Sequence, residues 1–151
     1  MIVTERNDTS YWIVVASRDH VQRALEQGIC QVCHGKEPQL KRMSAGDWVV
    51  FYSSKERYRG AERCRRFSAI GKVRDEPVYQ VRTDEYFAPF RRSVEYYPCS
   101  EVPIEPLIPL LSFIRSKKSW GYAFKFGLIR IPRQDFLSIA SRMLPALQEA
   151  V

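Results

Sequence analysis

The sequence predicts an α+β fold: a small mixed β-barrel with short helices packed around it, in a single domain. Three observations lead to this prediction. The 151 residues contain many short apolar runs with strand-like patterns and a few segments with helical spacing. Apolar residues make up 45% of the chain, which is enough for a real core. No internal repeat, low-complexity tract or long linker divides the chain, so one compact unit is expected.

The chain begins with a weakly patterned lead-in at residues 1–10, and the domain is expected to occupy residues 11–151. The run YWIVVA at residues 11–16 is almost entirely apolar and contains several β-branched side chains. This pattern predicts a central strand that is buried on both faces. Trp12 within it is interpreted in two ways, as a core residue or as a ring that stacks on a ligand.

A short helix is expected after this strand. Ser17 can accept a hydrogen bond from the amides that open the helix. Val21, Ala24 and Leu25 then lie on one face of it, and Gly28 is the residue type that ends a helix.

The stretch from Gly28 to Ser54 holds the densest cluster of unusual polar residues, and the functional hypothesis depends on it. A strand-like run at residues 29–32 enters a polar loop, and a second run at residues 48–52 follows a turn signal. If these two runs pair, the loop and the strand end enclose a pocket with an aromatic wall, which suits a planar heterocycle. The residues expected to face this pocket are His34, Gly35, Lys36, Tyr52, Ser53 and Ser54.

Cys30, Cys33 and His34 spell CxxCH, the pattern of covalent haem attachment. Haem attachment requires export to an oxidising compartment, whereas the surrounding residues are typical of a buried strand with small thiol side chains. A zinc site would lack a second close pair of ligands, and a redox pair would need a helix N-terminus behind it, which Pro38 disfavours. We therefore expect reduced thiols, no metal and no cofactor.

The charge of the chain favours a polyanionic partner. Lys and Arg number 24 against 17 Asp and Glu, which gives a net charge of +7 and a pI of about 9.4. After a helical turn at Leu40–Met43, the strongest basic run is a predicted loop at Lys55–Arg66, which contains Tyr58. This loop is interpreted either as a solvated surface or as a rim that faces phosphates.

The middle of the chain predicts three further strands, at residues 67–73, 78–81 and 93–97. Between the last two, residues 86–90 are rich in aromatic side chains and lead into Arg91 and Arg92. These rings either fill the core or form an aromatic wall beside cations.

The C-terminal part predicts an extended connection, a strand and a helix. Four prolines at residues 98–109 indicate the extended connection, and a short apolar helix is expected from Leu107. Residues 120–127 alternate aromatic and small side chains, which predicts a strand with its rings on one side that continues to Ile131. Residues 133–151 have apolar side chains at helical spacing and predict a helix that faces the core.

Several of these segments resemble the EVE-domain family of the PUA-like superfamily. The matching motifs are GICQVCHGK, LKRMSAGDWVVFYSSK, FSAIGKV, FAPFRR and WGYAFKFGLIRI. The resemblance spans Tyr11 to about Met143 and implies a PUA-like barrel related to YTH domains. It also implies that the chain recognises a modified nucleobase, chiefly a modified cytosine in DNA or RNA, by holding a flipped base in a partly aromatic pocket without catalysis.

Together, the pattern and the resemblance assign two sets of residues. The base-pocket set is Trp12, Ser17, Gln31, His34, Gly35, Lys36, Tyr52, Ser53, Trp120 and Phe124. The set that faces the nucleic-acid backbone is Lys55, Arg57, Arg63, Arg65, Arg91 and Arg92.

The leading hypothesis is a non-catalytic reader, monomeric, whose partner is DNA or RNA carrying a modified base. One alternative is an enzyme in which His34 and Lys36 act as acid and base, although the sequence has no acidic cluster for metal ions. A third is a small-molecule or protein-interaction module. The N-terminus lacks a signal-peptide pattern and no apolar stretch approaches about 18 residues, so a soluble, cytoplasmic protein without membrane contact is expected.

Overall fold

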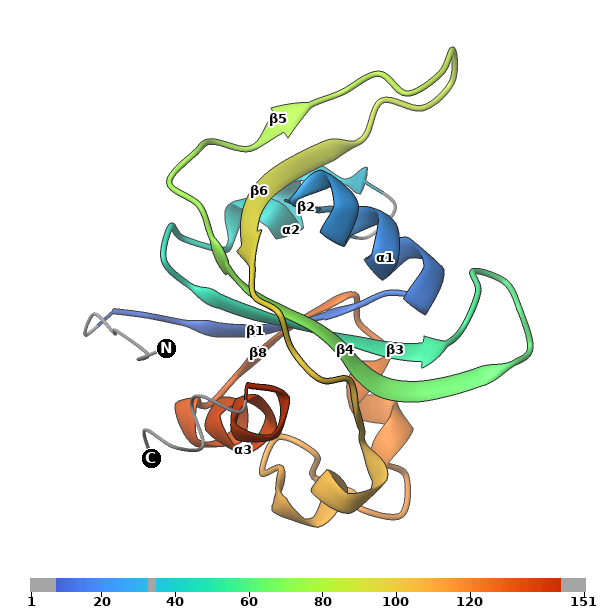
Figure 1. The fold of residues 1–151 in the computed structure, drawn as a ribbon, viewed down its shortest axis with the longest axis vertical. Coiled ribbons are helices and arrows are strands. Elements are labelled where there is room, and N and C mark those ends of the chain that lie inside the picture. Colours follow the sequence, from blue (N-terminus) through green and yellow to red (C-terminus); the bar gives the residue numbers. More distant parts are fainter. Residues whose placement is uncertain (1–7, 33–34, 145–151) are drawn as a thin grey trace.

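The chain folds around one strongly curled sheet with helices on both of its faces (Figure 1). The computed structural model describes residues 8–32 and 35–144. The strands are β1 (Tyr11–Val15), β2 (Ile29–Cys30), β3 (Trp48–Lys55), β4 (Arg63–Val73), β5 (Tyr79–Gln80), β6 (Phe90–Tyr96), β7 (Val102–Pro103) and β8 (Leu128–Ile131). The helices are α1 (Arg18–Gln27), α2 (Glu37–Lys41) and α3 (Arg133–Met143), with 3₁₀ helices η2 (Glu105–Leu110) and η3 (Trp120–Phe124).

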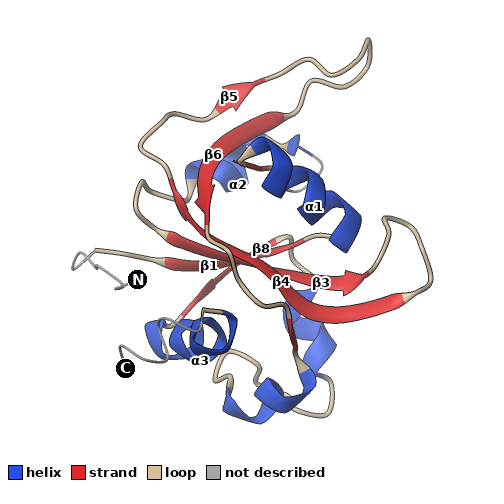
Figure 2. Cartoon of the chain, in the orientation of Figure 1, coloured by secondary structure: helices blue, strands red, loops and turns tan. Residues whose placement is uncertain are grey.

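The predicted fold class is confirmed. The sheet has the order β2-β6-β4-β3-β1-β8, while β5 adds to β6 and β7 adds to β4. It curls into a half-barrel, and Figure 2 shows α1 and α2 on one side of it and α3 on the other. The sheet is mixed, because β1 runs parallel to β3 and antiparallel to β8.

The central strand β1 is buried on both faces, as its apolar run predicts. Side chains that alternate along β1 and β3 enter opposite halves of the core, because successive side chains of a strand point to opposite faces. Ile13 and Val50 pack on the side of α3, whereas Val14 and Phe51 pack on the side of α1. The parallel pairing of Val15 with Tyr52 brings the carboxyl ends of β1 and β3 to the same edge of the sheet.

Helix α1 follows β1 and ends at Gly28, as predicted. Gly28 adopts a left-handed backbone with φ of 66°, which glycine accepts without steric cost. Ser17 does not cap the helix through its side chain; instead its hydroxyl donates to Oδ1 of Asp19 at 2.5 Å, and the amide of His20 donates to the same carboxylate. Leu25 is also exposed rather than core-facing.

The predicted pairing of residues 29–32 with residues 48–52 is wrong. β2 contains only Ile29 and Cys30 and pairs with β6, while both edges of β3 are occupied by β1 and β4. The longer strands β1 and β4 offer β3 more hydrogen bonds and more apolar contact than a two-residue strand can. The local sequence contains no information about this competition for partners.

The predicted loop at Lys55–Arg66 is shorter than expected, because both of its ends are strand. β3 continues to Lys55 and β4 begins at Arg63, so only residues 56–62 connect them. Between the pairs Ser53 with Arg66 and Lys55 with Arg63, the register shifts, and Arg65 adopts a left-handed backbone with φ of 54°. This is a β-bulge, which re-aims a side chain without ending the ladder.

The predicted strand at residues 120–127 is wrong as well. Its first part is the 3₁₀ helix η3, and only residues 128–131 form a strand, β8. The four-residue spacing of Trp120 and Phe124 places both rings on one side of a helical turn, where they meet edge to face at 6.2 Å between centroids. That contact and the burial of Phe124 favour the helical turn over an extended strand.

Helix α3 confirms the predicted C-terminal helix up to Met143, and residues 145–151 lie outside the described part of the chain. The predicted extended connection contains the short strand β7 and then η2. Within the residues that the structure describes, no helix is long and apolar enough to cross a membrane.

Candidate functional site

Two clefts adjoin at the edge of the sheet where β1 and β3 end. The large cleft has a volume of about 1020 Å³ and lies among α1, the loop after β2, the β3–β4 connection and the segment between β5 and β6. The small cleft has a volume of about 340 Å³ and lies between the β3–β4 ladder and η3. Val15, Ser54 and Phe124 line both clefts. The parallel arrangement of β1 and β3 is the reason that both clefts open at one edge.

The lining of the large cleft combines cations with aromatic rings. Its basic lining residues are Arg23, Lys36, Lys55, Arg57, Arg59, Arg91 and Lys125. Its aromatic lining residues are His20, Phe51, Tyr58, Phe87, Phe124 and Phe126. Among the residues that the structure describes, no Asp or Glu lines this cleft. Such a surface attracts an anionic ligand that carries a planar ring.

A hydrogen-bonded trio fixes one wall of the large cleft. Nε of Arg91 donates to Oε1 of Gln31 at 2.9 Å, and Nη1 of Arg91 donates to Oε1 of Gln27 at 3.0 Å. The amide nitrogen of Gln31 makes no hydrogen bond to any described residue. Gln31 lines the cleft and therefore offers an oriented donor for the edge of a ligand.

An aromatic rim borders the large cleft at the start of α1. The rings of His20 and Tyr58 stack with centroids 4.9 Å apart and an interplanar angle of 26°. Arg59 lies 5.3 Å from the centroid of the Tyr58 ring, and the amide of Tyr58 donates to the Asp19 carboxylate. His20 was not among the residues predicted for the site, although Tyr58 inside a basic run was a usable signal for this rim.

The loop after β2 packs against the segment that joins β5 to β6. Gly35 has φ of 81°, and a Cβ added there would lie 2.5 Å from Cβ of Pro89 and 3.4 Å from the Phe87 ring. Glycine is therefore required at position 35 because any side chain would collide with Pro89. It places Lys36 and Phe87 on the lining of the large cleft. Cys33 and His34 lie outside the described residues.

The small cleft has an aromatic floor and a cationic edge. Tyr52 is only 1% exposed, and its ring lies 4.3 Å from that of Phe124 between centroids. The guanidinium of Arg65 lies 5.5 Å from the centroid of the Trp120 ring, and Lys118 and Ser119 complete the lining. Burial raises the pKa of Tyr52, so its hydroxyl remains a hydrogen-bond donor.

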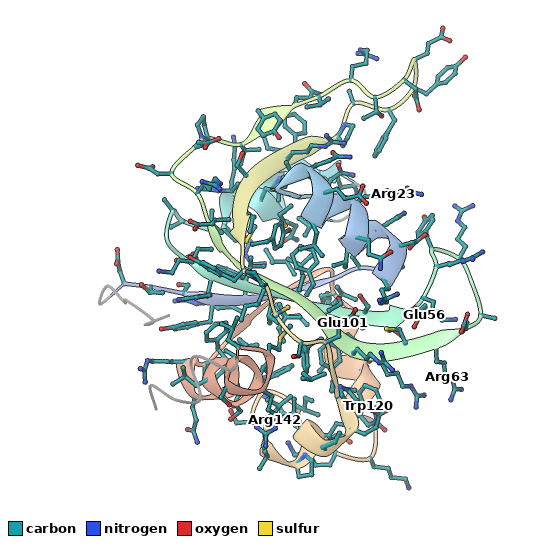
Figure 3. The ribbon with its side chains drawn as sticks, in the orientation of Figure 1. Arg23, Glu56, Arg63, Glu101, Trp120 and Arg142 are labelled. Atoms are coloured by element: carbon teal, nitrogen blue, oxygen red, sulfur yellow. The ribbon has the colours of Figure 1, made fainter. Side chains whose placement is uncertain are left out.

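The structure divides the predicted pocket residues between these two clefts and the core. The large cleft receives Ser17, Gln31, Gly35, Lys36 and Phe124, with the basic residues Lys55, Arg57 and Arg91. The small cleft receives Tyr52, Trp120 and Phe124, with Arg65. Figure 3 shows the basic Arg23 on α1 above the sheet and Trp120 below it.

Four predicted site residues line neither cleft. Trp12 is core: it is 3% exposed, and its indole nitrogen donates to Oδ2 of Asp47 at 2.9 Å. Ser53 is fully buried and shares a hydrogen bond of 2.7 Å with the Ser68 hydroxyl. Arg92 donates to the carbonyl of Met43 at 2.6 Å and so ties β6 to the end of α2. Arg63 is exposed and points away from the body of the molecule (Figure 3).

The described thiols and acids do not gather into a reactive cluster. Over residues 8–32 and 35–144, no group of three His, Cys, Asp or Glu side chains could hold a metal ion. Cys30 is fully buried, and burial raises the pKa of its thiol to about 12. A thiol in that environment is protonated and unreactive at neutral pH.

The chain matches one protein family and is similar in sequence to several bacterial proteins. The profile of the EVE domain matches residues 10–142. The chain is 45% identical over 128 residues to the UPF0310 protein in the gntR 5′ region of Bacillus licheniformis, covering 85% of this chain and 87% of that protein. It is 37% identical over 136 residues to the UPF0310 protein YdcG of Bacillus subtilis, covering 90% and 93%.

Solved structures show the same fold at low sequence identity. A protein from Leishmania major superposes with a TM-score of 0.57 at 13% identity, covering 91% of this chain and 96% of that one. The Mmi1 YTH domain superposes with a TM-score of 0.57 at 9% identity, covering 93% and 78%. The YTH-like architecture that the sequence predicted is therefore confirmed.

Proposed function

The chain belongs to the EVE-domain family, and we propose that it is a non-catalytic nucleic-acid-binding module that reads a modified base, with a modified cytosine as the leading candidate. The observation that carries the proposal is the large cleft, whose lining contains seven cations and no carboxylate of the described residues. A cleft with this charge and with aromatic walls matches both parts of a nucleotide, the phosphate and the base.

The cations of the large cleft would hold the phosphate backbone. Lys55 ends β3, Arg57 and Arg59 follow it, and Lys125 follows η3, so two separate segments contribute cations to the lining. Neutralising several phosphates releases condensed counterions, which supplies affinity that does not depend on sequence. This term brings the strand to the cleft but does not distinguish one base from another.

The interior of the large cleft would select the base. Its volume of about 1020 Å³ leaves room for a nucleotide that has left its stack. Phe87 or the Tyr58 ring can stack on the base, and the free amide nitrogen of Gln31 can donate to its edge. Flipping costs a few kcal/mol, whereas one stacked ring returns about 1 to 3 kcal/mol and the phosphate contacts supply the remainder.

The absence of carboxylates from the described lining supports a binding role over a hydrolytic one. Phosphoryl transfer and nuclease chemistry use acidic side chains to hold divalent ions. The ring of His20, which could serve as a base, is stacked on Tyr58. The lining instead consists of cations, rings and neutral hydrogen-bonding groups.

The proposal is tested by a binding screen with the purified protein. Single-stranded and duplex oligonucleotides of DNA and RNA would each carry one modified cytosine or modified adenine at the centre, and each would be compared with its unmodified counterpart. We expect at least one modification to bind about tenfold or more tightly than its counterpart, the ratio that one good edge contact or stacked ring produces.

The same screen on the Phe87→Ala variant tests whether the large cleft holds the base. This variant should lose the ratio while keeping the weak binding that the cations provide. The control is Tyr86→Ala, which removes the neighbouring ring; that ring is 90% exposed and lines neither cleft. Equal affinities for all modified and unmodified probes would refute base reading, and retention of the ratio by Phe87→Ala would exclude that ring as the stacking surface.

A further inference from the structure

We propose that the small cleft is a second nucleotide subsite, which binds the phosphate and part of the nucleoside adjacent to the base in the large cleft. This inference rests on the proposed function. It makes the ligand a strand of at least two linked nucleotides rather than a free modified nucleoside. Trp120 and Tyr52 were predicted to share one pocket with Gln31 and Lys36, whereas in the structure the two pairs line different clefts.

The two clefts share part of their lining at the edge of the sheet. Val15, Ser54 and Phe124 line both, so one wall of each cleft is formed by the same three side chains. Phe124 is only 7% exposed and is held by contacts with Tyr52 and Trp120. In this proposal, a strand that leaves the large cleft past these shared residues enters the small cleft.

The backbone conformation at Arg65 accompanies the placement of its cationic side chain on the lining of the small cleft. Arg65 occupies the β-bulge between β3 and β4 in a left-handed conformation that non-glycine residues rarely adopt. The bulge brings its guanidinium over the Trp120 ring at 5.5 Å. Its carboxylate neighbour is Glu105, at 4.0 Å, on the limit of an ion pair. Arg65 therefore keeps donors for a phosphate beside a ring that can contact a nucleoside.

The second observation is a tyrosine hydroxyl on the lining of the small cleft. Tyr52 is only 1% exposed as a residue but lines the small cleft, and its hydroxyl makes no hydrogen bond to any described residue. Burial raises its pKa and the nearby Arg65 cation opposes that rise, which places the hydroxyl within the field of Arg65. A hydroxyl that lines the cleft without a protein partner can donate to a phosphate or sugar oxygen bound there.

The size and lining of the small cleft fit this part of a nucleotide. A volume of about 340 Å³ is at the lower end of ligand sites, enough for one phosphate and a portion of the attached nucleoside. Lys118 adds a second cation, and Ser54 and Ser119 add hydroxyls. Each cleft alone could hold a small anion, but their shared wall favours one connected ligand.

The test compares ligands that differ by one nucleotide. The probes are 5-methyldeoxycytidine monophosphate and the two dinucleotides in which thymidine precedes or follows it, together with the same three molecules built on unmodified deoxycytidine. Dissociation constants are measured by calorimetry for the wild type and for each variant. We expect one of the two dinucleotides to bind more tightly than the mononucleotide, and we call this increase the neighbour gain.

Three variants probe the small cleft. Trp120→Ala removes the ring, Arg65→Asn removes the cation with a residue that accepts a left-handed backbone, and Tyr52→Phe removes only the hydroxyl. Each should reduce the neighbour gain, by roughly five- to hundred-fold for the ring, without changing the affinity of the mononucleotide. Arg63→Asn is the matched control, because it removes the same charge from the same strand at a residue that lines neither cleft.

The outcomes separate this inference from the proposed function. A wild type without a neighbour gain, or a gain that all three variants keep, overturns the small-cleft subsite. A neighbour gain that these variants reduce, but that is equal for modified and unmodified cytosine, supports the subsite. Base reading itself is then decided by the screen of modified oligonucleotides. Circular dichroism and thermal melting of each variant establish that the fold is intact before the binding constants are compared.

Discussion

Nε of Arg91 donates a hydrogen bond to Oε1 of Gln31 at 2.9 Å and so connects β6 to the loop after β2. The same guanidinium also donates to Gln27 at the end of α1. With its oxygen engaged, Gln31 is left with a directed amide nitrogen on the lining of the large cleft. The pair therefore converts a flexible side chain into a fixed hydrogen-bond donor.

Replacing Gln31 by alanine should lower the affinity for the preferred modified oligonucleotide about tenfold, because one net hydrogen bond contributes about 1 kcal/mol or slightly more. Nonspecific binding should remain, since no charge is altered. Gln27→Ala is the control, because it removes the other acceptor of Arg91 but leaves the bond between Arg91 and Gln31. Equal losses in both variants would show that Gln31 acts only by positioning Arg91.

Salt dependence should locate the phosphate-facing surface. Arg57→Ala combined with Lys125→Ala removes two cations of the large cleft and should lower the slope of log affinity against log salt by about 0.7 to 0.9 per lost phosphate contact. Arg63→Ala combined with Arg130→Ala removes two exposed cations that line neither cleft. If both double variants reduced the slope equally, the binding would depend on net charge and not on the cleft.

Gly35→Ala should destabilise the protein by more than about 1 kcal/mol, because φ is 81° and the new Cβ would lie 2.5 Å from Cβ of Pro89. The loop or the segment that carries Phe87 must move, so base binding should fall as well. Gly121→Ala is the control, since a Cβ there meets no atom within 4 Å. Chemical denaturation measures the unfolding free energy of both variants. Equal stability of Gly35→Ala and wild type would refute the predicted contact.

Asp47→Ala should cost about 3 kcal/mol or more of unfolding free energy. Its carboxylate is 2% exposed and accepts bonds from the amide of Ser10, the indole of Trp12 and the amide of Ser44, at 3.0, 2.9 and 2.8 Å. Alanine would leave three donors without this acceptor, at about 1 to 3 kcal/mol for each that stays buried. Asp75→Ala, at an exposed turn, should stay within about 0.5 kcal/mol of wild type.

The buried thiol of Cys30 predicts a loss of stability at alkaline pH. Burial raises its pKa from 9.0 to about 12, so the folded state keeps the proton that the unfolded state releases. The contribution of this thiol is complete below pH 9 and is lost as the pH rises from 9 towards 12. Cys30→Ala should flatten the fall of unfolding free energy over this range. An identical pH profile for variant and wild type would contradict the assignment.

Local sequence was enough for the elements whose signals are contained within a few residues. The apolar run at residues 11–16 predicted a strand buried on both faces, and β1 is such a strand. The apolar spacing after residue 17 and Gly28 predicted α1 and its end, and the same periodicity predicted α3. The composition predicted a basic surface, and seven cations line the large cleft. Each of these features depends on the order of residue types along the chain or on its charge, and both can be read from the sequence.

Only the tertiary structure decided which segments are neighbours. Strand partners are chosen by competition among all strands, so β3 lies between β1 and β4, and residues 29–32 pair elsewhere. The alternating rings from Trp120 fit a strand or a tight helix equally well. In the helix that forms, Phe124 contacts Tyr52 and Trp120 contacts Arg65. The division of one predicted pocket into two clefts, and the burial of Trp12 on Asp47, follow from long-range packing that no local pattern encodes.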